Sequence, residues 1–173
     1  MQIFYLPDSC TLILFFLLWP AFQVTAALLC LAMDNSHFSY KSFIYRSRKW
    51  EDEGKIYQKI FKIRSWKKYL PDGGALMKGG YAKRHLQTLS KEGLQRFLVE
   101  SCRAELSHIL AILPFWVFGL FAPPRVILFM FIYSMAMNLP CIITQRYNRP
   151  RIVRLLQDVE RSEIGMYRST PPT

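Results

Sequence analysis

Residues 9–33 are SCTLILFFLLWPAFQVTAALLCLAM, a stretch of the chain that holds no charged side chain. About 20 apolar residues in a helix cross a hydrocarbon core of about 30 Å, so this stretch predicts a transmembrane helix. The alternative is a cleaved signal peptide, which would begin with basic residues. The preceding MQIFYLPD has none and carries one Asp, which favours a retained helix.

Basic residues follow both apolar regions of the chain. After the first come Lys41, Arg46, Arg48 and Lys49, and after the second come Arg146, Arg149, Arg151 and Arg154. Basic residues concentrate on the cytoplasmic side of a membrane. We therefore expect a multi-pass protein of the cell membrane that crosses it three times, with its N-terminus outside and its C-terminus in the cytoplasm.

The second apolar region predicts a helical hairpin, with a turn at Ala122-Pro123-Pro124-Arg125. Its second arm, Val126–Thr144, is long enough to span. The first arm, Ile109–Phe121, is short. It must either include the preceding turn with Glu105 and His108 or remain re-entrant, and the sequence leaves both possibilities open.

The predicted fold is thus an all-α integral membrane protein with a single domain over residues 1–173. It has four parts: a transmembrane helix at 9–33, a basic interfacial cytoplasmic segment at 34–105, an apolar hairpin at 106–144 and a basic cytoplasmic tail at 145–173. The net charge of +11 arises mostly from the second part. We expect residues 55–68 there to form an amphipathic helix on anionic lipid, with Ile56, Tyr57, Ile60 and Phe61 at the acyl boundary. A solvated basic face on a small domain is the alternative.

A further helix is predicted from residue 90 into the membrane. Ser90 is suited to be its N-cap and Glu92 to its first turn, while Leu94, Phe97, Leu98 and Ser101 share one side.

Several signatures of enzyme chemistry are missing from the chain. GxGxxG, GxxxxGK[ST], GxSxG, HExxH and the HxxxxD of glycerolipid acyltransferases do not occur. The single Glu105-Leu-Ser-His108 is only half of a carboxylate-bridged metal site, so we expect no metal and no bound cofactor. The chemistry then depends on His85, His108 and Glu105, with arginines that can hold a phosphate or a carboxylate. A Glu-Arg-His cluster that merely balances charge at the membrane entrance is equally compatible with these residues.

Several motifs resemble one known family, the glycosyl-4,4′-diaponeurosporenoate acyltransferases of staphyloxanthin-type carotenoid biosynthesis. The resemblance covers about residues 44–156. It is carried by Trp66-Lys67, Asp72-Gly73, Arg84-His85-Leu86, Arg103-Ala104-Glu105-Leu106 with His108, Ile112-Leu113-Pro114 and Gln145-Arg146-Tyr147-Asn148-Arg149-Pro150-Arg151.

The resemblance implies an acyltransferase that transfers groups other than aminoacyl groups. A fatty acyl group would be esterified to the glucose 6-hydroxyl of a glycosylated C30 carotenoid acid, from acyl-CoA or acyl carrier protein as co-substrate. The candidate catalytic residues are His108, Glu105 and His85, and the candidate substrate-binding residues are Arg84, Arg103, Asp72, Arg146, Asn148 and Arg149. The expected partners are the carotenoid lipid, the acyl donor and anionic membrane lipid, without nucleic acid. A non-catalytic membrane subunit that binds anionic lipid and a partner enzyme is the alternative.

Overall fold

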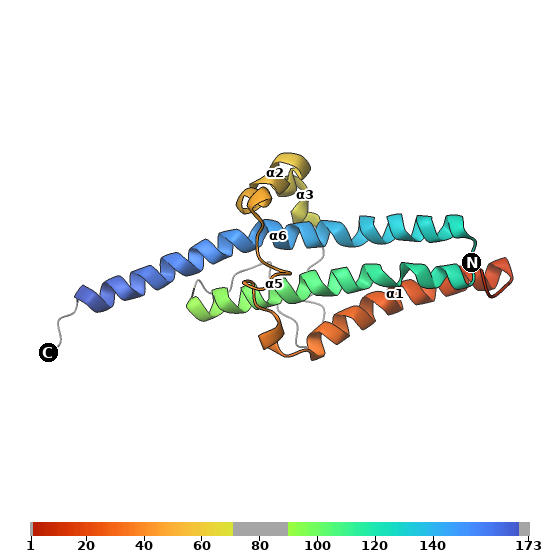
Figure 1. Cartoon of the computed structure of the whole chain (residues 1–173), viewed down its shortest axis with the longest axis horizontal. Coiled ribbons are helices and arrows are strands. Elements are labelled where there is room, and N and C mark those ends of the chain that lie inside the picture. Colours follow the sequence, from red (N-terminus) through yellow and green to blue (C-terminus); the bar gives the residue numbers. More distant parts are fainter. Residues whose placement is uncertain (1, 71–89, 170–173) are drawn as a thin grey trace. The chain divides into compact units, whose positions relative to one another are not determined.

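The computed structural model describes residues 2–70 and 90–169, and the side chains of these ranges as far as Glu163. Its described residues form helices and turns without a strand (Figure 1). The elements are α1 (Asp8–Ala32), η1 (Asn35–His37), η2 (Lys49–Gly54), α2 (Lys55–Phe61), α3 (Ile63–Trp66), η3 (Lys67–Tyr69), α5 (Lys91–Ile112), η4 (Leu113–Leu120) and α6 (Pro124–Ser169). The prediction of an all-helical chain is confirmed.

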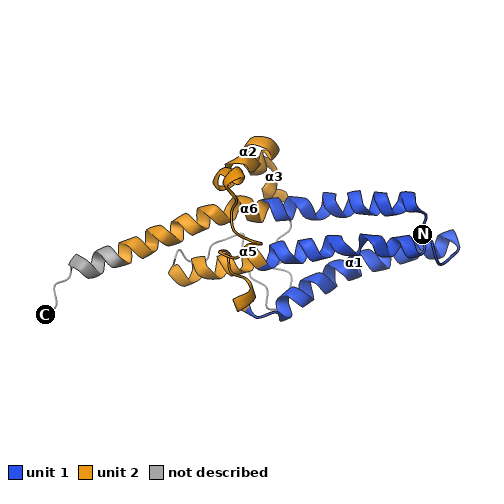
Figure 2. Ribbon diagram, in the orientation of Figure 1, with its two compact units in different colours: residues 1–34, 103–143 blue, residues 35–102, 144–173 orange. Residues whose placement is uncertain are grey.

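The chain divides into two compact units (Figure 2). Unit 1 comprises residues 1–34 and 103–143, and unit 2 comprises residues 35–102 and 144–173. Helices α5 and α6 each contribute residues to both units.

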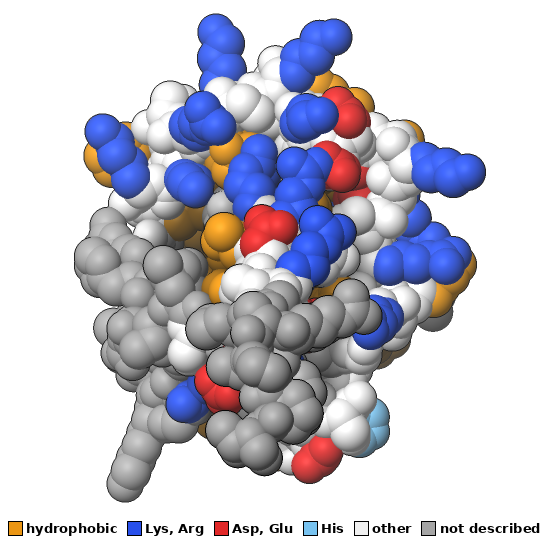
Figure 3. Space-filling view, turned by 90° about the vertical axis from the view of Figure 1, so that its left-hand side faces the viewer, with side chains coloured by type: hydrophobic (Ala, Val, Ile, Leu, Met, Phe, Trp, Pro, Cys, Tyr) orange, Lys and Arg blue, Asp and Glu red, His pale blue; other side chains and the backbone are white. Residues whose placement is uncertain are grey.

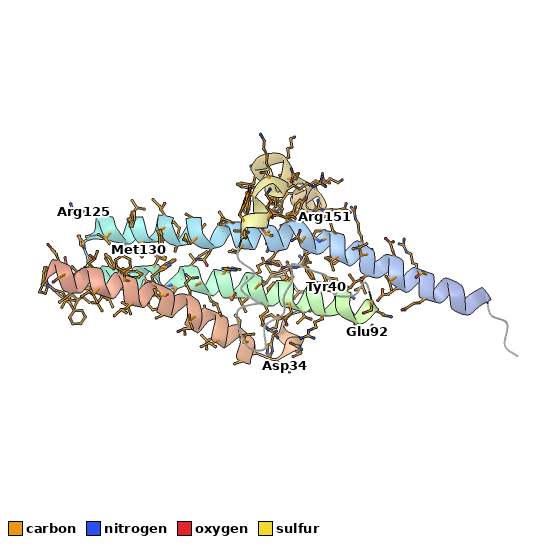
Figure 4. The ribbon with its side chains drawn as sticks, turned by 180° about the vertical axis from the view of Figure 1, so that it is seen from behind. Asp34, Tyr40, Glu92, Arg125, Met130 and Arg151 are labelled. Carbon is orange, nitrogen blue, oxygen red and sulfur yellow. The ribbon has the colours of Figure 1, made fainter. Side chains whose placement is uncertain are left out.

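Unit 1 is built from α1, the end of α5 with η4, and the beginning of α6. Its core cluster consists of Phe118, Phe121 and Met130. Side chains of α1 pack against this cluster, and Phe15 lies edge-on to Phe118 with ring centroids 5.2 Å apart. Figure 4 shows Met130 on α6, a little more than one turn after Arg125 at the beginning of that helix. Aromatic contacts therefore hold the apolar helices together.

Much of the apolar surface of unit 1 faces outward. Exposed side chains include Leu12, Ile13, Phe16, Leu17, Leu28, Leu29, Leu128, Phe129 and Ile132. Three helical stretches are long and apolar enough to cross a membrane: Asp8–Ala32, Lys91–Leu120 and Pro124–Glu163. Apolar side chains on the outside of long helices are the arrangement that suits a lipid surrounding.

The hairpin has its turn where the sequence predicts it. Helix η4 ends at Leu120 and α6 begins with Pro124, a residue that suits the first position of a helix. The first arm includes the preceding turns, because α5 continues through Glu105 and His108 into η4. A helical stretch of 30 residues results, Lys91–Leu120, so the arm is not limited to the short uncharged run that begins at Ile109.

Unit 2 contains its own core between α5 and α6. Its buried members are Leu94, Phe97, Leu98, Ile152 and Leu156. Ser90 caps α5 as predicted, since the Gly93 amide donates to Ser90 Oγ at 3.2 Å. Leu94, Phe97, Leu98 and Ser101 are all buried, which confirms the predicted inner face of this helix.

The prediction of one amphipathic helix over residues 55–68 is wrong. Helix α2 ends at Phe61, Lys62 has φ 48° and ψ 45°, and α3 starts at Ile63. Tyr57 and Ile63 are both buried, although six residues of continuous helix would turn them about 240° apart. The break at Lys62 brings both to the inside, so Tyr57 does not lie at an acyl boundary. Ile60 and Phe61 are exposed, and binding of the segment to lipid remains a prediction.

Gly54 allows α2 to approach α6 closely. Its φ of 83° is left-handed, and a Cβ added here would lie 3.0 Å from the Tyr147 carbonyl oxygen and 3.2 Å from Tyr147 Cα. Both the conformation and the space favour glycine at this position.

We predict that Gly54→Ala destabilises the protein by at least about 1 kcal/mol, because a Cβ is disfavoured in the left-handed conformation and also clashes with α6. Thermal unfolding of the full chain in detergent, followed by tryptophan fluorescence, measures the change. Gly93→Ala is the matched control. Gly93 lies in the first turn of α5 without a positive φ, so alanine there should leave stability equal or higher. Equal melting temperatures of Gly54→Ala and the wild type would contradict the prediction.

Candidate active site and cationic cluster

The polar centre of unit 1 is a hydrogen bond between two helices. His108 on α5 places Nδ1 at 2.9 Å from Asn138 Oδ1 on α6. Asn138 is buried, with 1% of its surface exposed, and His108 is half-buried. Polar side chains among apolar helices are costly unless they are matched, and these two match each other.

The hydrogen bonds of Asn138 determine which nitrogen of His108 carries the proton. Asn138 Nδ2 donates to the Ser134 carbonyl at 3.0 Å, and a carbonyl can only accept. The amide oxygen therefore faces His108, which must donate from Nδ1. In the neutral imidazole Nε2 then carries the lone pair, which is the form that accepts a proton from an alcohol.

Two other candidates from the sequence lie on the same helix as His108. Glu105 is fully buried, one turn before the histidine, and Arg103 is also buried. That Glu105 orients His108 and that Arg103 binds substrate remain predictions.

Unit 2 has a buried ionic centre at Glu51. Its carboxylate accepts hydrogen bonds from the Tyr57 hydroxyl, the Arg48 backbone amide and Arg146 Nη1, the last at 2.9 Å. Only 1% of Glu51 is exposed. Arg146 also donates from Nη2 to the Ile44 carbonyl at 2.8 Å, so one side chain of α6 holds two segments of the preceding chain.

The surroundings of Glu51 shift two pKa values. Burial by itself would raise the pKa of the Glu51 carboxyl, but the donors Tyr57, Arg48 and Arg146 outweigh it and hold the pKa below its ordinary value. Burial, followed by the hydrogen bond to the Glu51 carboxylate, raises the pKa of Tyr57. Glu51 is thus an anion and Tyr57 a neutral donor near pH 7.

Arg149 has contacts inside unit 2. It is 2% exposed and donates to the Tyr45 carbonyl at 2.7 Å. Its Nη2 lies 3.2 Å from the Ser101 carbonyl and 3.3 Å from Ser101 Oγ. These bonds connect α6 with α5 and with the segment after α1. A direct contact of Arg149 with substrate remains a prediction.

Of the remaining candidate site residues, the structure describes one, Asn148. Asn148 is half-buried and accepts a hydrogen bond from Lys67 Nζ at 3.3 Å. Asp72, Arg84 and His85 lie outside the described residues. The structure thus pairs Arg146 and Asn148 with side chains of the segment between α1 and α5.

Sequence reasoning missed Asn138 and Glu51 as site residues. Asn138 was detectable, because an amide inside the apolar arm at 126–144 is costly without a partner. Ser134, four residues earlier, lies on the same face of the helix. Glu51 gave no comparable signal, since three consecutive acidic residues at 51–53 are typical of a solvated turn.

Three helices are long and apolar enough to span a membrane, and they indicate a helical membrane-associated protein. Its candidate base is His108, which the Asn138 amide holds in one of these helices. Comparison with known proteins gives the family. The model of the glycosyl-4,4′-diaponeurosporenoate acyltransferases matches residues 41–158. The protein of this name from Staphylococcus aureus strain MRSA252 is 38% identical over 144 residues, which cover 83% of this chain and 86% of that protein. Its counterpart from strain bovine RF122 / ET3-1 is 37% identical over the same shares.

The chain belongs to the glycosyl-4,4′-diaponeurosporenoate acyltransferase family, and it is an acyltransferase. The resemblance over about residues 44–156 is therefore confirmed. No solved structure matches the chain significantly.

We predict that Glu51→Gln lowers the free energy of unfolding at pH 7 by about 2 kcal/mol, because Arg146 and Tyr57 lose a charged partner. The folded pKa of Glu51 lies below its ordinary value of 4.5, so the unfolded chain binds the proton more readily. The stabilisation is therefore complete above pH 4.5 and disappears as the pH falls through the lowered pKa.

Unfolding in detergent at neutral and acidic pH, followed by tryptophan fluorescence, tests this. Glu53→Gln is the matched control, since Glu53 pairs with Arg154 at a half-exposed position. It should cost less than about 1 kcal/mol. A difference between Glu51→Gln and wild type that grows towards acid would refute the assignment.

Proposed function

We propose that this acyltransferase esterifies a fatty acyl group to the glucose 6-hydroxyl of a glycosylated C30 carotenoid acid, with His108 as the base. The family's name supports the choice of acceptor. The observation that carries the mechanism is His108, whose Nδ1 is fixed by Asn138 and whose Nε2 is the accepting nitrogen. A polyene and a fatty acyl chain also suit a protein with exposed apolar helices.

The reaction needs one proton transfer in each direction. The sugar oxygen attacks the carbonyl carbon of an acyl thioester while His108 Nε2 takes the hydroxyl proton. The new C–O bond forms, the C–S bond breaks, and the imidazolium returns the proton to the leaving thiolate. Asn138 is a positioning residue in this scheme, because it keeps the proton of the neutral ring on Nδ1.

We predict that His108→Ala lowers the rate of acyl transfer by a factor of 10² to 10⁴, the usual range for a lost general base. The assay uses the full chain in detergent with a glycosylated carotenoid acid and an acyl thioester, and mass analysis of the product. His37→Ala in η1 is the matched control and should be as active as the wild type. His85→Ala tests the competing base. Normal product formation by normally folded His108→Ala would reject His108 as the base.

The positioning role of Asn138 has its own test. Asn138→Leu removes the acceptor and should lower kcat about 10- to 100-fold, while Asn138→Asp keeps an acceptor oxygen and should retain more activity. A merely structural role predicts that both variants lose abundance and activity in parallel. Unchanged kcat in a folded Asn138→Leu protein would exclude the positioning role.

We also propose that the N-terminus lies outside and the C-terminus in the cytoplasm. Support comes from unit 2, where residues 35–70 and 90–102 fold with residues 144–169 through pairs such as Glu51–Arg146. Segments in contact must lie on the same side of a membrane. Both carry the basic residues that favour the cytoplasmic side.

We predict that Gln2→Cys reacts with a membrane-impermeant maleimide in intact cells and that Arg161→Cys reacts only after the cells are opened. Gln2 is partly exposed and Arg161 is exposed in the structure. The four natural cysteines are first replaced by serine, because Cys10 is exposed and would react itself. Reaction of Arg161→Cys in intact cells would reverse the topology.

A further inference from the structure

Three cationic side chains of unit 2 surround one tyrosine. Tyr147 on α6 is 2% exposed, and its hydroxyl accepts a hydrogen bond from Arg64 Nε at 3.0 Å. The Arg151 guanidinium lies 3.7 Å from the centre of the Tyr147 ring, and Lys67 Nζ lies 5.1 Å from it. Arg151 also donates to the Tyr147 carbonyl. We call Arg64, Lys67 and Arg151 the tyrosine-centred cationic cluster.

This cluster has no acidic partner among the described residues. The three carboxylates of η2 are matched elsewhere: Glu51 with Arg146, Asp52 with Lys55, and Glu53 with Arg154. Among the described residues, the charged ends of Arg64 and Lys67 contact neutral groups, namely the Tyr147 side chain and the Asn148 amide oxygen. Like charges gathered at one point repel each other, so the arrangement favours an anion that would relieve the repulsion.

The donors of the cluster suit a phosphate group. Arginine presents a planar fork to phosphate oxygens, and a lysine adds a mobile point charge. The Tyr147 ring and hydroxyl hold Arg64 and Arg151 near their positions, which reduces the ordering needed on binding. Lysine and arginine side chains also gather over the upper part of the face shown in Figure 3. Their positive charges would attract anions to this face.

We propose that the tyrosine-centred cationic cluster binds a phosphate group, and that this phosphate belongs to the nucleotide part of a coenzyme A thioester that donates the acyl group. The inference rests on the proposed function only in this choice of source. A phospholipid headgroup carries the same chemistry, and the experiment separates the two.

The test measures equilibrium binding of coenzyme A to the full chain in detergent. Arg64→Gln, Lys67→Gln and Arg151→Gln should each weaken binding about tenfold or more. Lys59→Gln, which removes an equal charge from α2 outside the cluster, should change it less than twofold.

Pantetheine, which lacks phosphates, should bind no better to the wild type than to the variants. Arg64→Lys, which keeps the charge, should bind more strongly than Arg64→Gln. Melting curves identify variants that are folded.

A second arm measures binding to vesicles that contain phosphatidylglycerol. If the variants lose vesicle binding but bind coenzyme A as the wild type does, the bound phosphate belongs to a lipid headgroup. That result would overturn the proposal that it belongs to the acyl donor. Unchanged binding of both probes in folded variants would overturn the site itself.

Kinetics keep this inference distinct from the proposed function. The cluster variants should raise the KM for the acyl-coenzyme A donor and leave kcat nearly unchanged, because they remove binding made equally in the ground and transition states. Coenzyme A binding that depends on the cluster, without transfer to a glycosylated carotenoid, would contradict the proposed acceptor and leave the phosphate site intact. Transfer to the glycosylated carotenoid with an unchanged KM for the donor in the variants would contradict the phosphate site and leave the proposed acceptor intact.

Discussion

The hydrogen bonds made by four consecutive side chains of α6 hold unit 2 together. Successive residues of a helix point about 100° apart, so four of them are directed all around the axis. Each reaches a different part of the chain: Arg146 reaches Glu51, Tyr147 reaches Arg64, Asn148 reaches Lys67, and Arg149 reaches Tyr45 and Ser101. Helix α6 is consequently an axis around which the other segments of this unit are arranged.

The backbone between η1 and η2 lies outside the helices, and this fits the use of arginine as a donor. Ile44 and Tyr45 lie outside the helices, so their carbonyls need hydrogen-bond donors other than those of a helix. Arg146 and Arg149 supply them through nitrogens that remain charged at any physiological pH. The arrangement also makes burial of Arg149 tolerable, since its guanidinium contacts three oxygens although it is almost fully enclosed.

The sequence predicted those features that depend on local pattern. The charge-free stretch at 9–33, the turn at two prolines and the Ser90 cap each follow from composition within a few residues. The break at Lys62 did not, because local pattern does not show which side chains the rest of unit 2 buries, and Tyr57 and Ile63 are both buried. The contacts of Arg146 were equally hidden, since Glu51 lies 95 residues away and nothing local marks it as a partner. The motif at 145–151 indicated importance for the family without indicating which contacts its residues make.

The pairing of His108 with Asn138 has a geometric reason in the hairpin. Each residue lies 15 positions from Pro123 at the turn, one on either side. Two arms of similar length that run back along each other place such residues side by side. The match holds to within about one helical turn, because the 3₁₀ portion of the first arm rises faster per residue than an α-helix. Among apolar side chains the amide and the imidazole then have each other as suitable partners. A polar residue on one arm of a membrane hairpin thereby predicts where its partner stands on the other, and a histidine paired in this way has a defined proton-accepting nitrogen.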